Sequence, residues 1–152
     1  MNSIILLLGS NIEPEKNMKA AVKMLDNVIA SSNLWKTRSF GSKGPDFLNL
    51  AVEVHSPLDQ QSFKQTVIRE IEQHLGRVRT ADKYAPRTID VDIVIFNGEV
   101  VDPDVWEKGF MAVPVSELRP NLVSPDNHKL SAVAKKLKSA AGAELFISES
   151  QN

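Results

Sequence analysis

The feature that most constrains this chain is a short apolar segment, Thr88–Phe96, that carries two carboxylates, Asp90 and Asp92. Its β-branched and apolar residues predict a buried strand. Residues i and i+2 of a strand project from the same face, so the two carboxylates lie side by side, with Cβ atoms about 7 Å apart. Two anions at this separation raise the pKa of one of them unless a cation is close. The pair therefore predicts a nearby cation, for which a divalent metal is a natural candidate.

A basic segment precedes this strand. It contains Arg77, Arg79, Lys83 and Arg87, with Asp82 as its only acid, although the whole chain has a net charge of −1. Cations followed by an acidic pair suit a polyphosphate that is held through Mg²⁺. The alternative is that the two carboxylates form ion pairs with these basic side chains on an open sheet face. The spacing alone leaves both interpretations open, because D-x-D on a strand is a weak motif.

Length and composition restrict the class of protein. At 152 residues we expect one domain, residues 1–152, and the 42% hydrophobic and 24% charged residues are typical of a globular protein. The absence of cysteine excludes disulfides and thiolate metal sites and fits the reducing cytoplasm, where we expect the protein. The apolar run Ile4–Leu8 is too short to span a bilayer, so we expect a strand and no membrane partner. The near-neutral charge gives no general attraction to nucleic acid.

Hydrophobic periodicity predicts the elements of the first half of the chain. Ser3–Leu8 is a continuous apolar run that ends at Gly9, which is typical of a central strand. Apolar residues then recur at three- and four-residue steps, which predicts a helix from Pro14 to near Ser31. After it we expect a strand over Asn33–Phe40, a loop over Gly41–Pro45 and a strand over Phe47–His55.

The second half contains a further helix, two strands and C-terminal helical segments. The helix opens at Ser56–Asp59 and closes at Gly76. Its predicted core stripe is Phe63, Val67, Ile71 and Leu75. After the acidic strand, Asn97-Gly98 predicts a hairpin turn that leads to a short strand. The remaining predictions are a strand at Glu99–Val101, irregular structure over Asp102–Gly109, a helical turn at Ser116–Arg119 and a helix at Lys129–Ala141.

The order βαββαβ, followed by C-terminal helices, predicts an α+β fold, a ferredoxin-like sandwich with a largely antiparallel sheet and helices on one face. The other face is then free for ligands. Asn49 and Phe47 share one face of their strand, and an aromatic ring beside an amide suits a planar ligand, although an exposed polar face is the alternative. Glu72 lies near the end of its helix, where the dipole does not favour an acid, so it needs a partner such as an arginine or a ligand hydroxyl.

Several motifs together resemble a known family. They are Leu8-Gly9-Ser10-Asn11, Pro45-Asp46-Phe47-Leu48-Asn49, Gly76-Arg77-Val78-Arg79, Pro86-Arg87-Thr88-Ile89-Asp90-Val91-Asp92-Ile93 and the spaced set Phe110, Pro114, Glu117-Leu118, Pro120 and Pro125. The chain is similar, from about Ile4 to about Leu137, to the 6-hydroxymethyl-7,8-dihydropterin pyrophosphokinases of folate biosynthesis. The resemblance implies the ferredoxin-like fold and transfer of diphosphate from ATP to the hydroxymethyl oxygen of the dihydropterin, with release of AMP.

The resemblance also implies roles for individual residues. Asp90 and Asp92 would ligate two Mg²⁺ ions against the phosphates of ATP, the co-substrate. Arg77 and Arg87 match the catalytic arginines. The pterin-binding positions are Asn49, Phe47, Tyr84 and Phe110, and the ATP-binding positions are Glu72, Arg79, Lys83 and Ile93.

The chain departs from the family pattern in its loops. The segment Phe40–Pro45 is shorter than the loop that closes over the pterin, and Val101–Lys108 contains no histidine and a single basic residue. The basic segment has Thr80, Tyr84 and Ala85 where relatives commonly show lysine or arginine, tryptophan and glycine. Because such loops exclude water and complete the site, these changes bear on the rate more than on the fold.

Three functions therefore compete. The first is an active pyrophosphokinase, and the second is a weakly active or non-catalytic relative that binds pterin or nucleotide. The third, a single-strand nucleic-acid binder, is disfavoured because the open face offers mainly Phe47 and acids. P-loop and Rossmann motifs are absent from the sequence. We expect small-molecule substrates as partners, without nucleic acid or membrane, and the sequence does not indicate an oligomeric state.

Overall fold

One antiparallel sheet runs through the molecule. The structure, a computed structural model, describes residues 1–38, 45–76 and 88–147. Within them the strands are β1 (Asn2–Ser10), β2 (Val28–Ser31), β3 (Trp35–Thr37), β4 (Phe47–Ser56), β5 (Asp90–Phe96), β6 (Glu99–Val100) and β7 (Glu144–Leu145). Their order is β6-β5-β1-β4-β3-β7, and β2 pairs with the other end of β4. All neighbouring strands are antiparallel, with β1 between β4 and β5, which confirms the predicted ferredoxin-like sheet.

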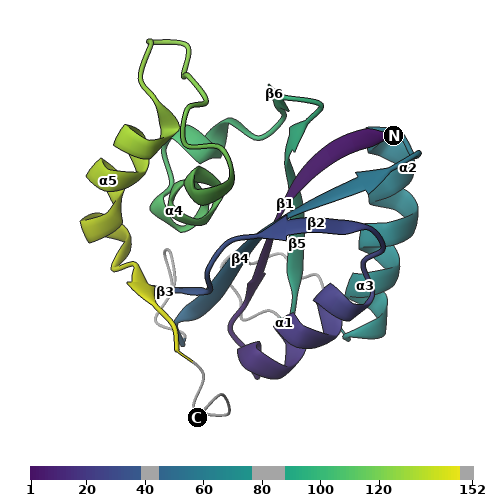
Figure 1. The fold of residues 1–152 in the computed structure, drawn as a ribbon. Helices are drawn as coiled ribbons and strands as arrows, with labels where there is room; N and C mark the ends of the chain where they lie inside the picture. Colours follow the sequence, from purple (N-terminus) through teal and green to yellow (C-terminus); the bar gives the residue numbers. More distant parts are fainter. Residues whose placement is uncertain (39–44, 77–87, 148–152) are drawn as a thin grey trace.

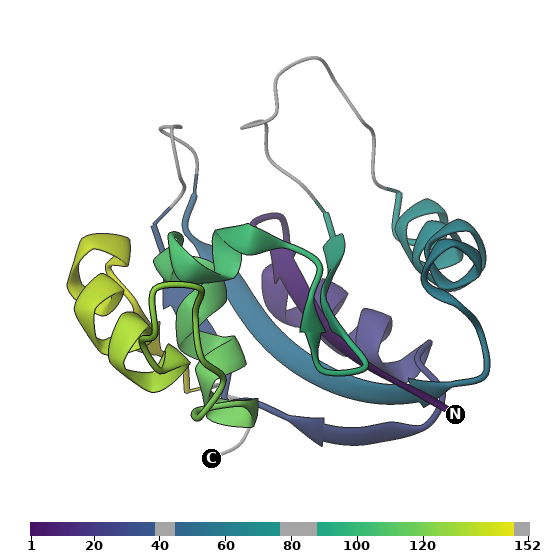
Figure 2. The same cartoon turned by 90° about the horizontal axis from the view of Figure 1, so that it is seen from above.

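Helices cover both faces of this sheet (Figures 1 and 2). The helical elements are α1 (Pro14–Lys23), α2 (Gln60–Phe63), η1 (Lys64–Ile68), α3 (Arg69–His74), η2 (Pro103–Trp106), α4 (Gly109–Leu118) and α5 (Leu130–Ala141). None of the helices in the described part of the chain is long and apolar enough to cross a membrane.

The strand residues alternate between two cores. On one face, Leu6 and Val52 pack with α1 and with α2 to α3, through residues such as Met18 and Phe63. On the other face, a second buried cluster joins the sheet to α4 and α5; it includes Ile5, Leu7, Ala51, Met111, Val115 and Leu130. The prediction that the second face would be free for ligands is therefore only partly correct, because α4 and α5 cover much of it.

The first helix is shorter than the periodicity predicts. Helix α1 ends at Lys23, and Asn27 then adopts a positive φ of 55°. The chain turns there into β2, so Val28 pairs with Val54 of β4 and does not continue the helix. The predicted helix to Ser31 is wrong because β-branched Val28 and Ile29 fit a sheet edge, and Asn27 tolerates the left-handed turn that separates the two elements.

The second helix contains a π-helical turn that the sequence does not reveal. It begins where predicted, because the Asp59 carboxylate accepts the Ser62 N–H at 2.8 Å, and Gly76 beyond its end has the expected positive φ of 75°. Residues Lys64–Ile68 are π-helical, and the Arg69 N–H donates to the Lys64 carbonyl. The predicted stripe of Phe63, Val67, Ile71 and Leu75 packs against the core, and the extra residue in this turn adds Ile68, which is more buried than Val67.

The π-helical turn also sets the direction of Glu72. At about 100° per residue, Glu72 would lie about 180° from Phe63 around an uninterrupted α-helix. Absorbing one extra residue reduces this angle to about 80°. Phe63 and Glu72 consequently both face inward and are 3% and 6% exposed.

The C-terminal part confirms some predictions and corrects others. Asn97 and Gly98 form the predicted turn, with φ of 50° and 84°, and α5 ends at the predicted Ala141. The segment expected to be irregular contains η2, and α4 begins at Gly109 although only a turn at its end was predicted. The sequence does not predict this helix, because Pro114 lies inside it and proline usually interrupts a helix.

The predicted loop at Gly41–Pro45, in the first half of the chain, lies almost entirely outside the described residues.

Candidate active site

The register of the three central strands creates a flat floor at one end of the sheet. Gly9 of β1 is opposite Asn49 of β4 on one side and Asp90 of β5 on the other. A Cβ atom on Gly9 would lie 3.2 Å from Asn49 Oδ1 and 3.8 Å from the Phe47 ring. The glycine therefore leaves room above the floor that a side chain would fill.

A cavity of about 500 Å³ lies over this floor. It is lined by Leu7, Gly9, Thr37, Arg38, Phe47, Asn49, Asp90, Asp92, Asp102, Asp104, Lys108, Phe110 and Met111. The sheet supplies the floor, and η2 and the first turn of α4 supply a wall. The structure thus brings together the predicted aromatic residues Phe47 and Phe110, the predicted amide Asn49 and both predicted aspartates.

The Asn49 amide is held in one orientation. Asn49 is 2% exposed, and its Nδ2 donates to Thr37 Oγ1 at 2.6 Å. Its Oδ1 consequently faces the space above Gly9. An acceptor fixed beside two aromatic side chains suits a flat heterocycle with N–H groups on its edge.

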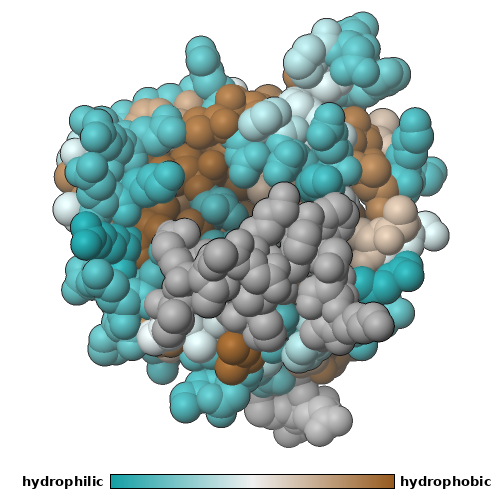
Figure 3. All heavy atoms as spheres, turned by 180° about the vertical axis from the view of Figure 1, so that it is seen from behind, coloured by the Kyte–Doolittle hydropathy of each residue, from teal (hydrophilic) through white to brown (hydrophobic). Residues whose placement is uncertain are grey.

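A second cavity, of about 850 Å³, lies between β5 and the helical segment formed by α2, η1 and α3. It is lined by Gln61, Lys64, Gln65, Ile68, Arg69, Glu72, Gln73, Asp90, Val91 and Asp92. Figure 3 shows apolar surface on the side of the molecule that α2 and α3 occupy, bordered by hydrophilic residues. Glu72 Oε2 accepts the Val91 N–H at 3.4 Å, so a backbone amide of β5 is among the partners of this acid.

The two cavities meet at Asp90 and Asp92, which line both. Both side chains are partly exposed and come from alternate positions of β5. Thr88, just before the strand, has a buried hydroxyl without a hydrogen-bond partner in the described part of the molecule. No cluster of three or more potential metal ligands occurs among the described residues. Two carboxylates fit Mg²⁺ all the same, because this ion is commonly held by one or two carboxylates and substrate phosphates.

Further charged residues around the two cavities were not found by sequence reasoning. The first cavity is also lined by Arg38, Asp102, Asp104 and Lys108, and the second cavity is also lined by Lys64 and Arg69. Burial raises the pKa of Asp102 above its ordinary value, and the Asp104 N–H that Asp102 accepts opposes this rise. These residues belong to no motif, and their position depends on how η2 and the second helix pack. A helical-wheel comparison could have found Lys64 and Arg69 only if the π-helical turn were known.

Several predicted site residues are not placed by the structure. Arg77, Arg79, Lys83, Tyr84 and Arg87 lie outside the described residues. Ile93 is described, and its side chain packs against the core on the α1 side of the sheet and lines neither cavity. The ATP contact of Ile93 stays a prediction.

The fold and the site define a class of protein. It is an α+β protein with one cavity lined by two phenylalanines and a held amide, and a second cavity lined in part by cations, joined at a pair of carboxylates. This arrangement suits an enzyme that transfers a phosphoryl group between two bound small molecules.

Comparison with known proteins identifies the family. Residues 5–120 match the family model of 7,8-dihydro-6-hydroxymethylpterin-pyrophosphokinase. The chain is 30% identical over 136 residues to the 2-amino-4-hydroxy-6-hydroxymethyldihydropteridine pyrophosphokinase of Synechocystis, covering 80% of this chain and 69% of that protein. It is 33% identical over 150 residues to the enzyme of the same name from Methylorubrum extorquens, covering 89% and 94%. The chain therefore belongs to this family of ATP-dependent pyrophosphokinases, which act on a pterin in folate biosynthesis.

A solved structure supports the fold. The Plasmodium falciparum HPPK-DHPS A437G structure with STZ-DHP superposes with a TM-score of 0.67 at 12% sequence identity. The match covers 91% of this chain and 46% of the Plasmodium chain, so this chain spans less than half of that protein.

Proposed function

We propose that this chain binds 6-hydroxymethyl-7,8-dihydropterin in the first cavity and MgATP in the second, and transfers diphosphate between them. In this reaction the hydroxymethyl oxygen forms a bond to the β-phosphorus of ATP. The bond from that phosphorus to the oxygen it shares with the α-phosphorus breaks, AMP leaves, and the hydroxyl proton is released. The observation that carries the proposal is the position of Asp90 and Asp92, which line both cavities.

The first cavity supplies orientation for the pterin. Phe47 and Phe110 line it and offer apolar contact to the rings, while Asn49 fixes their direction through its held amide. A flat ring oriented in this way can present its hydroxymethyl group toward the shared carboxylates. Holding two reactants in a fixed geometry lowers the barrier to their reaction.

Asp90 and Asp92 would hold the metal, and we propose two Mg²⁺ ions. Bound there, the ions would neutralise charge on the transferring diphosphate. By holding the ions, the two carboxylates would also place the nucleotide phosphates next to the pterin cavity, which would lower the entropic cost of the reaction. Asp92 is opposite Leu7 in the β1–β5 register, deeper in the sheet than Asp90.

The remaining roles rest on the motif match. We propose that Arg77 and Arg87 act on the moving diphosphate, that Tyr84 adds to the pterin site, and that Glu72, Arg79, Lys83 and Ile93 contact ATP. The family match over residues 5–120 includes all of these positions and supports the assignment. For Glu72, the second cavity gives independent support, since Glu72 lines it beside Asp90.

We further propose a single domain over residues 1–152 that works in the cytoplasm without nucleic acid. The four carboxylates that line the first cavity argue against a polyanionic nucleic-acid strand there. No observation favours the non-catalytic alternative, since the acidic pair and the held amide are both present.

The proposed reaction predicts particular products. With MgATP and 6-hydroxymethyl-7,8-dihydropterin, ³¹P NMR should show AMP and a new pterin diphosphate in equal amounts. Formation of AMP should depend on the pterin. Release of ADP in place of AMP, or an AMP signal that does not require the pterin, would contradict the proposal.

A further inference from the structure

The two ends of α4 have different surroundings. At the N-terminal end, Phe110 and Met111 line the first cavity. At the C-terminal end, Glu117 and Arg119 bind to separate parts of the sheet. We infer that Glu117 is a positioning residue for the first cavity, acting through β3 on Thr37 and Asn49.

Glu117 binds the segment that enters β3. Its Oε1 accepts the Asn33 backbone N–H at 2.9 Å and Asn33 Nδ2 at 3.0 Å. Its Oε2 accepts Trp35 Nε1 at 2.5 Å. One carboxylate therefore accepts three hydrogen bonds from two residues that lie about 80 positions earlier in the chain, and hydrogen bonds to an ionised acceptor are stronger than neutral ones.

Trp35 connects this contact to the cavity. It is opposite Asn49 in the β3–β4 register, and Thr37, two residues further along β3, is opposite Phe47. The Thr37 hydroxyl oxygen accepts a hydrogen bond from Asn49 Nδ2, and the oxygen of the same amide faces the cavity. Trp35 is 7% exposed, and Lys138 Nζ of α5 lies 5.0 Å from the centroid of its ring. A shift of Trp35 would therefore move the short strand that orients Asn49.

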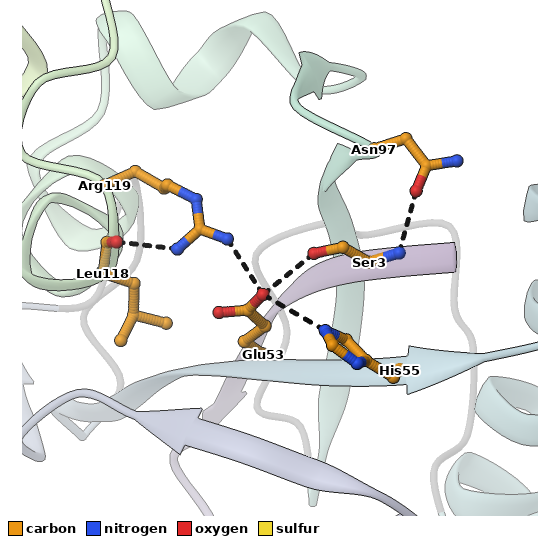
Figure 4. A network of polar contacts seen from close by, with 6 residues as sticks. All are labelled: Ser3, Glu53, His55, Asn97, Leu118 and Arg119. Carbon is orange, nitrogen blue, oxygen red and sulfur yellow. Dashed lines mark hydrogen bonds and ion pairs between the residues drawn. The ribbon is translucent and has the colours of Figure 1, made fainter. Parts of the chain in front are cut away.

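A second contact holds α4 independently of Glu117 (Figure 4). Arg119 donates to Glu53 Oε2 of β4 at 2.9 Å and to the Leu118 carbonyl at 2.8 Å. The Ser3 hydroxyl of β1 donates to the same Glu53 oxygen at 2.9 Å. Because buried apolar residues of α4 also pack on the sheet, loss of Glu117 alone should leave the fold intact.

The substitution Glu117→Gln changes this contact with little change in size. In the parent, Oε1 serves the two Asn33 donors and Oε2 serves Trp35, and glutamine replaces one of these two oxygens by an NH₂ group, which only donates. At least one donor then faces another donor. The matched control is Glu107→Gln, which removes the same charge from an exposed residue shortly before α4 that lines neither cavity.

The first test is kinetic and rests on the proposed function. In Glu117→Gln, KM for the pterin should rise about tenfold, the size expected when a hydrogen bond to a charged group is lost. The kcat and the KM for MgATP should stay within about twofold of the parent, and Glu107→Gln should match the parent in all three. A purely structural role would lower kcat by reducing the folded fraction and leave both KM values unchanged, which would overturn the inference.

The second test does not require the reaction. In ¹H–¹⁵N spectra, Glu117→Gln should shift the Trp35 indole and Asn49 side-chain amide signals, whereas Glu107→Gln should shift neither. Trp35→Phe removes the donor, so Glu117→Gln should change the Asn49 signal less in a Trp35→Phe background. If the Asn49 signal does not respond to Glu117→Gln, the inference fails even if the enzyme is active. If it responds but the parent forms no AMP, the proposed function fails and the positioning role stands.

Discussion

At the scale of the single residue, the proposed recognition of the heterocycle rests on Asn49. It is almost fully buried, and the hydrogen bond from its Nδ2 to Thr37 determines on which side of the amide the oxygen lies. Gly9 completes the arrangement because it has no side chain beside the Asn49 oxygen. In the proposed site, Gly9 and the Asn49 amide would therefore define where a flat ligand can lie.

The substitution Asn49→Leu tests this role. Leucine is similar in size but offers no acceptor, so the N–H groups on the edge of the pterin would lose their partner. We expect KM for the pterin to rise by about tenfold or more, with a smaller change in KM for MgATP. Steady-state kinetics measure both constants. As a comparison, Thr37→Val should show a smaller rise, because it frees the amide without removing it, and an unchanged KM in Asn49→Leu would contradict the proposed role.

The sequence predicts those site residues that lie on strands and fails for those placed by packing. Asp90 and Asp92 follow the two-residue period of β5, and Phe47 and Asn49 follow that of β4, so each strand assignment fixes the common face of its own pair. This reasoning does not find Thr37, because its role depends on the pairing of β3 with β4. Asp102 is not found either, because its place beside the cavity depends on how η2 and α4 pack on the sheet.

At the scale of the element, the π-helical turn explains how one helix serves the core and the second cavity. Its extra residue lets Phe63 and Ile68 pack inward while Glu72 reaches β5. A regular α-helical period predicts the core contact of Val67 and misses that of Ile68, because the hydrophobic pattern on both sides of the turn fits a helix in isolation. The turn becomes visible only when both halves are fixed against the same sheet.

Deletion of Thr66 should consequently be tolerated. Thr66 is exposed and lines neither cavity, and removing one residue from the π-helical turn restores a regular helix with Phe63 and Glu72 in their present directions. We expect the midpoint of urea unfolding to stay close to that of the parent. Deletion of Lys19, an exposed residue of the regular helix α1, should lower the midpoint strongly, since it rotates Ala21 away from the core. Equal losses in the two deletions would contradict this account of η1.

The crossing of α4 and α5 depends on Gly109. A Cβ atom there would lie 2.6 Å from Ala141 Cβ and 2.8 Å from the Leu137 carbonyl oxygen. We expect Gly109→Ala to destabilise the protein by about 1–3 kcal/mol, measured by urea unfolding, because the two helices must separate. Adding Ala141→Gly should recover part of this loss relative to Ala141→Gly alone. Full stability in Gly109→Ala would show that the helices can separate at no cost.

At the scale of the whole molecule, a polar network joins strands and a helix that are distant in sequence. Glu53 of β4 accepts from Ser3 of β1 and from Arg119 after α4, and His55 Nε2 lies 3.7 Å from the same carboxylate oxygen (Figure 4). The hydrogen bond from Arg119 lowers the pKa of Glu53 below its ordinary value of 4.5, although burial opposes this change. The network thus makes stability depend on pH.

The sign of this dependence follows from the lowered pKa. A carboxyl group whose pKa is lower in the folded state stabilises the fold above its unfolded-state pKa and loses this contribution as pH falls through the folded-state pKa. We therefore expect the free energy of unfolding to fall below about pH 4.5. Arg119→Met should reduce stability near neutral pH and flatten this acid limb, whereas Lys136→Met, on an exposed position of α5, should leave the limb unchanged. An identical acid limb in Arg119→Met and the parent would contradict the assignment.

The arrangement of the strands is easier to predict than which helices cover each face of the sheet. The order of strands and helices determines the antiparallel sheet with β1 at its centre, since short connections leave few alternatives. The second layer, formed by α4 and α5, was not expected to cover the ligand face, because Pro114 hides α4 in the sequence and nothing local shows where a C-terminal helix will pack. The cavity exists because this layer covers the sheet only as far as Phe110.

The central claim is that both substrates react at the carboxylates shared by the two cavities. Its most direct test is the rate of pterin-dependent AMP formation in Asp92→Asn, with Asp26→Asn, an exposed aspartate that lines neither of these cavities, as the matched control. We predict a loss of roughly a hundredfold or more in Asp92→Asn, since a metal ligand is worth several kcal/mol in such a transfer, and no loss in the control. A rate in Asp92→Asn equal to that of the parent would contradict the account.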